Sequence, residues 1–179
     1  AEVTRRGTLV LAPSRDRADL DRFARMTQAH RPLDAEAMLI IEVEGSTEEQ
    51  DFLLRKMEEI CGRFDPISLK VAQSAEESAA IWKGRKGAFG AVGRISPDYL
   101  CMDGTIPTGQ LPFVLERMDE IIKGYGLRVA NVFHAGDGNL HPLILYDGRQ
   151  PGALERQHHA AFALGDLLAD TTALGKVAA

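Results

Sequence analysis

Hydrophobic and polar residues follow two alternating periods along this chain, which predicts strands interleaved with helices. Short apolar, partly β-branched runs predict strands at 8–12, 38–43, 67–71, 97–105, 127–133 and 140–146. Apolar residues spaced three or four apart predict helices at 15–29, 46–62, 74–92, 111–124 and 153–169. From residue 38 onward the predicted order is therefore β-α-β-α-β-α-β-β-α.

Helix boundaries are marked by polar side chains. Ser46 stands three residues before Glu49, the spacing of a capping box, and Ser74 precedes another acidic first turn. Glycines at 84, 87, 90 and 93 weaken the helix predicted at 74–92, each by up to about 1 kcal/mol relative to alanine.

The last two strands are separated only by a short glycine-aspartate turn, which is typical of a hairpin. The strands also lack the long Val/Ile runs of a sheet buried on both faces. We therefore expect an α+β fold, a mainly antiparallel sheet with helices on one face. Ferredoxin-like packing, in one copy or duplicated, is the expected architecture.

Composition narrows the classes of protein. The 179 residues are 45% hydrophobic, which excludes a disordered chain, and the net charge of −5 argues against a nucleic-acid partner. The longest wholly apolar stretch, at 37–41, is far shorter than the roughly 20 residues of a membrane helix. The two cysteines, Cys61 and Cys101, form no disulfide framework. We expect them to be free, buried apolar residues in a cytoplasmic protein.

The densest polar segment surrounds the predicted hairpin turn. His134 and His141 lie at the inner ends of its two strands, where side chains on one face approach to about 5 Å. Two such imidazoles can bind one divalent metal, with Asp137 or Asn139 orienting them. The alternative is an ordinary turn whose histidines bond to backbone groups. Residue spacing identifies no third ligand.

Three blocks together resemble a known family. They are HAGDGNLHP at 134–142 with the six residues before it, WKGRKGAFG at 82–90, and SPDY at 96–99 followed by MDGTIP at 102–107. Their order and spacing are similar to the C-terminal domain of FAD-linked 2-hydroxy-acid oxidoreductases, the group of glycolate oxidases and D-lactate dehydrogenases. The resemblance covers residues 33–168, so 1–32 is a poorly matching segment and 169–179 a divergent tail.

The resemblance implies a role for each matching residue. It implies that His134 and His141 face the flavin and hold a divalent metal such as zinc or manganese, and that Asn139 contacts the cofactor. It implies that Arg85 pairs with the substrate carboxylate, which a guanidinium fork matches geometrically. The alternative for Arg85 is a solvated helix charge.

The sequence departs from the family pattern in two places. It has no G-x-G-x-x-G cradle for a dinucleotide, and no Gly-Glu-His-Gly motif follows the last predicted helix. We therefore expect the third metal ligand and the general base to be missing. FAD would be held mainly by a separate FAD-binding domain or subunit.

Two hypotheses follow. The first is a substrate-binding domain for a small 2-hydroxy acid of the glycolate or D-lactate type, inactive alone. The second is a non-catalytic α+β binding or dimerisation module that retains the enzyme scaffold, with a second copy of the chain as its partner.

Overall fold

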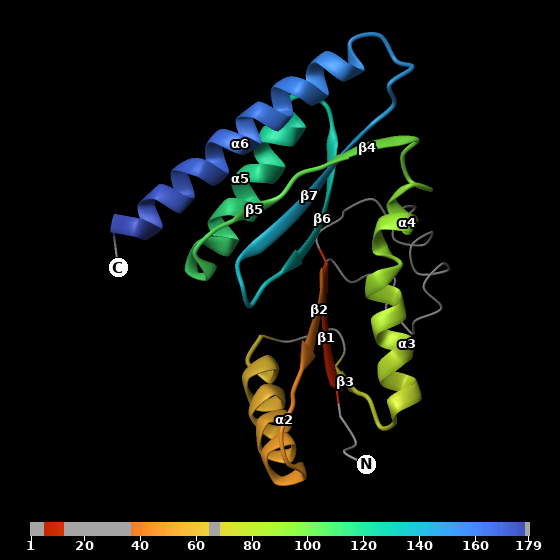
Figure 1. Ribbon diagram of the computed structural model, residues 1–179, viewed down its shortest axis with the longest axis vertical. Helices are drawn as coiled ribbons and strands as arrows, with labels where there is room; N and C mark the ends of the chain where they lie inside the picture. The colour runs from red at the N-terminus through yellow and green to blue at the C-terminus, as the bar shows by residue number, and fades with distance from the viewer. Residues whose placement is uncertain (1–5, 13–36, 65–68, 178–179) are drawn as a thin grey trace. The chain divides into compact units, whose positions relative to one another are not determined.

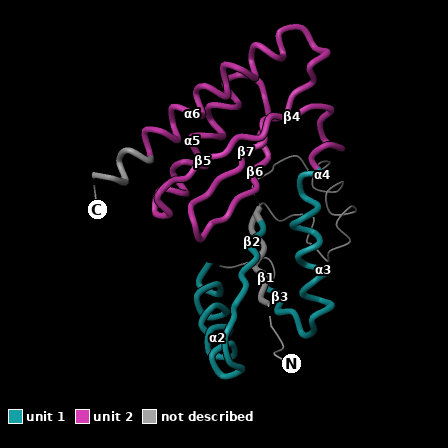
Figure 2. Tube along the Cα trace, in the orientation of Figure 1, with its two compact units in different colours: residues 1–91 teal, residues 92–179 magenta. Residues whose placement is uncertain are grey.

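A computed structural model of the chain describes residues 6–12, 37–64 and 69–177. The chain forms two compact units, residues 1–91 and 92–179 (Figure 2). No helix in the described part is long and apolar enough to cross a membrane. The helix predicted at 15–29 lies outside the described residues.

The N-terminal unit contains a three-stranded antiparallel sheet. Strand β1 (Arg6–Ala12) lies between β2 (Ala37–Glu42) and β3 (Leu69–Val71), with Thr8 opposite Ile40 on one side and Lys70 on the other. Helix α2 (Thr47–Gly62) connects β2 to β3. The strands expected here are confirmed, with slightly different ends.

The capping box predicted for α2 is present. The Ser46 hydroxyl accepts a hydrogen bond from the Glu49 amide at 3.3 Å, and the Glu49 carboxylate accepts one from the Ser46 amide at 2.8 Å. Both amides would otherwise lack partners in the first turn, so the two side chains fix where the helix begins.

The single helix predicted at 74–92 is two helices. Helix α3 (Ala75–Lys86) ends at Gly87, whose amide donates to the Lys83 carbonyl at 2.9 Å, and α4 (Ala88–Val92) begins at the next residue. Glycine loses more backbone freedom in a helix than other residues, which favours a break at Gly87, although Gly84 and Gly90 lie inside the two helices.

The C-terminal unit is built around a second antiparallel sheet. Its central strand, β7 (Asn139–Tyr146), pairs with β6 (Arg128–His134) on one side. On the other side it pairs first with β4 (Asp98–Cys101) and then with β5 (Gly104–Thr105). The single strand predicted at 97–105 is therefore divided.

Pro142, at the centre of β7, explains the division. The Met102 amide donates to the Pro142 carbonyl at 3.0 Å, but proline has no N–H to donate back. The ladder is therefore interrupted opposite Pro142, between β4 and β5.

Two helices cover one face of this sheet (Figure 1): α5 (Leu111–Gly124), preceded by a short 3-10 turn at Thr108–Gln110, and α6 (Ala153–Val177). The core between the helices and the sheet is apolar and almost wholly buried. It is formed by Ile106, Val114, Met118, Ile122, Leu140, Ile144, Ala160, Leu164 and Leu168.

The α+β class and the antiparallel sheet are thus confirmed, whereas the ferredoxin-like arrangement is not confirmed. Every strand pairing in the described residues is antiparallel, but the strands form two sheets, one in each unit.

Candidate functional site

The hairpin of β6 and β7 carries the predicted site. Its strands are joined by a four-residue turn, 135–138, in which the Asp137 amide donates to the His134 carbonyl at 3.1 Å. Gly138 adopts a φ of +67°, in the left-handed region that favours glycine. A Cβ atom at Gly138 would lie 2.0 Å from the Ile106 carbonyl oxygen, so the close approach of the chain just after β5 also requires glycine there.

The register of the hairpin places both histidines on one face. His134 lies opposite Asn139, and His141 lies opposite Val132. Because opposed residues share a face and alternate residues return to it, all four side chains lie on the same side of the sheet. The core residues Leu140 and Ile144 face the opposite side, toward α5 and α6. We call the first side the histidine face.

The two imidazoles meet edge to face. Their ring centroids are 5.4 Å apart and their planes are nearly perpendicular, at 87°. His134 is exposed, whereas the His141 side chain is 18% exposed. The prediction that these rings converge is therefore correct, and His141 bonds to more than backbone groups, because it has a carboxylate partner.

That partner is Asp103, a residue to which the sequence assigned no role. The carboxylate of Asp103 contacts the Nδ1 atom of His141 within hydrogen-bonding distance. Asp103 lies between β4 and β5, in the segment interrupted opposite Pro142. The sequence predicts Asp137 or Asn139 as the group that orients the histidines, but the carboxylate behind His141 comes instead from the neighbouring segment.

Cys101 lies two residues before Asp103 and is exposed, so the expectation of a buried thiol is wrong for this cysteine and correct for Cys61. Partial burial, and secondarily the Asp103 carboxylate, raise the pKa of the Cys101 thiol. The protonated thiol is a poor nucleophile, so its environment does not favour covalent catalysis.

Arg85 belongs to α3 in the N-terminal unit, and its approach to the histidines stays a prediction. Burial lowers the pKa of its guanidinium, which is less exposed than the neighbouring Lys83 and Lys86. None of the described residues forms an ion pair with Arg85. A half-buried guanidinium that pairs with no carboxylate of the described residues is suited to an anionic ligand.

The donor atoms on the histidine face fit half of a divalent metal site. Two imidazoles, one backed by a carboxylate, match common metal-ligating chemistry. Within residues 6–12, 37–64 and 69–177, however, no group of three His, Cys, Asp or Glu side chains is placed to hold an ion. A further ligand would therefore have to come from the substrate or from another segment.

The polar groups on the histidine face could bond to the ring of a flavin but form no site for its phosphates. Imidazole and amide groups, such as those of His134 and Asn139, can hydrogen-bond to a ring edge. Gly84, Gly87 and Gly90 lie within or between α3 and α4 and form no phosphate-binding loop.

Comparison with known proteins gives a consistent result. The sequence model of the family "FAD linked oxidases, C-terminal domain" matches residues 10–173. The Escherichia coli K12 protein "Glycolate oxidase subunit GlcD" is 50% identical over 125 residues, which are 70% of this chain and 25% of that protein. The Bacillus subtilis protein of the same name is 33% identical over 129 residues, 72% of this chain and 27% of that protein.

A more distant relative is the Arabidopsis thaliana protein "D-lactate dehydrogenase [cytochrome], mitochondrial", 27% identical over 122 residues, or 67% of this chain and 20% of that protein. The chain therefore spans about a quarter of the length of these curated relatives. The family match also includes much of the segment 1–32, which lies outside the resemblance seen in the sequence blocks.

Proposed function

Since the chain belongs to the family of FAD linked oxidases, C-terminal domain, we propose that it is the substrate-binding part of a flavin-dependent oxidoreductase. Its substrate would be a small 2-hydroxy acid of the glycolate or D-lactate type, in keeping with the names of its relatives. The observation that carries this proposal is the meeting of His134 and His141 on one sheet face, with Asp103 behind His141.

Each residue has a role in this proposal. His134 and His141 bind a divalent metal, such as zinc or manganese, through one ring nitrogen each. Arg85 binds the substrate carboxylate through two parallel hydrogen bonds. Asn139, beside His134 on the histidine face, contacts the cofactor or the substrate through its amide.

The cofactor belongs to a separate part of the assembly. We propose that FAD is bound mainly by an FAD-binding domain or subunit that covers the histidine face. When bound, FAD supplies a two-electron acceptor for the hydride from C2, while the hydroxyl proton leaves to a base and a 2-oxo acid is formed. The two free cysteines also agree with a cytoplasmic location, which we include in the proposal.

A thermal-shift experiment on the full chain tests the metal part. A ligand that binds only the folded state raises the melting temperature by mass action, so zinc or manganese should raise it in the unsubstituted chain. The double variant His134→Ala, His141→Ala should lose this shift.

Other surface histidines provide a matched control. The double variant His158→Ala, His159→Ala removes two exposed imidazoles from α6 and should keep the metal-dependent shift. An equal shift in all three proteins, or none in any of them, would contradict a metal site at the hairpin. The second outcome would favour the non-catalytic module.

Kinetics of the assembled oxidoreductase test the role of Arg85. Arg85→Lys keeps the charge but loses the bidentate geometry, so KM for the hydroxy acid should rise about ten- to a hundredfold. Lys86→Arg, one residue further along α3, should leave KM unchanged. Unchanged KM in Arg85→Lys, or a flavin that is not bleached by any 2-hydroxy acid, would refute the substrate assignment.

A further inference from the structure

The contact between Asp103 and His141 suggests a role for a third residue on the histidine face. The Asp103 carboxylate contacts the Nδ1 atom of His141, and not its Nε2 atom. From this geometry we infer that Asp103 is a positioning residue: it holds His141 in the tautomer that is protonated on Nδ1 and leaves Nε2 for a ligand. In identifying that ligand as a metal, the inference rests on the proposed function.

The chemistry of the carboxylate and the imidazole supports a proton on Nδ1 of His141. An ionised carboxylate can only accept hydrogen bonds, and a neutral imidazole has one N–H. The proton of His141 is therefore favoured on the nitrogen that faces Asp103, and the lone pair is left on the other nitrogen. A carboxylate behind a ligating histidine also fixes the plane of the ring and makes its nitrogen a better donor.

The backbone on both sides of Asp103 is fixed, although the Asp103 side chain is 77% exposed. Before it, the Met102 amide donates to the Pro142 carbonyl at 3.0 Å. After it, Gly104 pairs with Leu140, and a Cβ at Gly104 would lie 2.6 Å from the Leu168 side chain in α6. The carboxylate is thus presented to His141 by a segment that is anchored at each end.

Stability does not explain the contact. A hydrogen bond to a carboxylate that is mostly exposed contributes little to stability, because water competes for the carboxylate and the side chains lose freedom. His134, the other member of the pair, has no carboxylate partner among the described residues. The contact therefore distinguishes the two histidines, and its effect should be on the chemistry of His141.

The test compares the full chain with Asp103→Ala and with Asp98→Ala, a matched control from the same strand region. Long-range ¹⁵N NMR correlations of the imidazole rings report which ring nitrogen carries the proton. His141 should carry its proton on Nδ1 in the unsubstituted chain and in Asp98→Ala, and lose that preference in Asp103→Ala.

Calorimetric titration with zinc alone gives a second readout. Loss of a supporting carboxylate typically weakens metal binding ten- to a hundredfold, so Asp103→Ala should show about that loss and Asp98→Ala none. An unchanged His141 tautomer in Asp103→Ala, or equal losses of zinc affinity in both variants, would overturn the inference. A tautomer that changes as expected in a chain that binds no zinc would support the inference and contradict the metal in the proposed function.

Discussion

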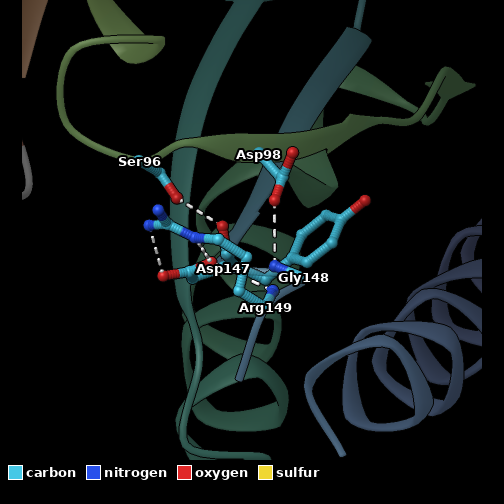
Figure 3. Close-up of polar contacts among 6 residues, drawn as sticks. Ser96, Asp98, Asp147, Gly148 and Arg149 are labelled. Carbon is cyan, nitrogen blue, oxygen red and sulfur yellow. Dashed lines mark hydrogen bonds and ion pairs between the residues drawn. The ribbon is translucent and has the colours of Figure 1, made fainter. Parts of the chain in front are cut away.

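The two ends of strand β7 carry polar clusters that use the same residue type differently. At the Tyr146 end, Asp98 accepts a hydrogen bond from the Gly148 amide at 2.9 Å, and Ser96 donates to the Tyr146 carbonyl at 2.7 Å (Figure 3). At the Asn139 end, Asp103 contacts a side chain, the imidazole of His141. Both aspartates come from the segment that pairs along β7.

The two contacts differ in whether the partner of the aspartate can also bind a ligand. A backbone amide that donates to Asp98 has no further chemistry, so that contact only joins β4 to the turn after β7. An imidazole has a second nitrogen, so the contact with Asp103 leaves a group that can bind a ligand. The contact at Asp98 is therefore structural, whereas the contact at Asp103 leaves one ring nitrogen of His141 available, as the proposed function requires.

The largest effect is expected from a substitution in the hairpin turn at the Asn139 end of β7. Gly138→Ala would place a Cβ 2.0 Å from the Ile106 carbonyl oxygen at a φ of +67°, so either the turn or the chain after β5 must move. We expect the free energy of unfolding to fall by on the order of 3 kcal/mol. Urea denaturation followed by circular dichroism measures this change.

Gly136→Ala is the control for that substitution. Gly136 lies in the same turn, has no positive φ, and a Cβ there would meet nothing within 4 Å. Its effect should stay within about 0.5 kcal/mol. Equal destabilisation by the two alanines would show that the close approach of Ile106 is not the reason why Gly138 is required.

A smaller effect is expected at the opposite end. Asp98→Ala removes the acceptor for the Gly148 amide, which should lower the free energy of unfolding by about 1 kcal/mol without changing zinc affinity. Asp103→Ala should do the reverse, with little change in stability and a marked loss of zinc affinity. Urea denaturation and zinc calorimetry on both variants test this prediction. If both variants lost stability and zinc affinity to the same extent, the two ends of β7 would not differ in role.

The features predictable from sequence are those encoded locally. His134 and His141 lie seven residues apart around a glycine-aspartate turn, so strand alternation alone places them near each other. The capping box at Ser46 is likewise complete within four residues. In both cases the interacting groups are close in sequence, and few alternative geometries compete.

The features that could not be predicted depend on packing between distant segments. Asp103 lies 38 residues before His141, and the two meet only because β5 pairs with β7 in one register. The interruption opposite Pro142 has the same origin, because the effect of a proline on a sheet depends on which strand lies beside it. The division of the 74–92 helix at Gly87 shows that the number of glycines indicated weakness but not the position of the break.

The smallest expected effect concerns the ion pair at the Tyr146 end. The Arg149 guanidinium donates to both carboxylate oxygens of Asp147, each at 2.8 Å, and together with the Arg149 amide it lowers the Asp147 pKa from 3.8 to about 2 (Figure 3). A depressed pKa in the folded state stabilises the fold above the unfolded value, and this contribution is lost as pH falls from about 4 to about 2.

The unsubstituted chain should therefore lose more stability over that range than Asp147→Asn or Arg149→Gln, which both remove the pair. Arg149 is exposed, so the difference should be slight and should shrink in high salt. Urea midpoints measured between pH 7 and pH 2 give the comparison, and three identical profiles would contradict it. Zinc affinity at neutral pH should be the same in all three proteins, because this pair, unlike Asp103 and His141, contains no nitrogen that can bind a metal.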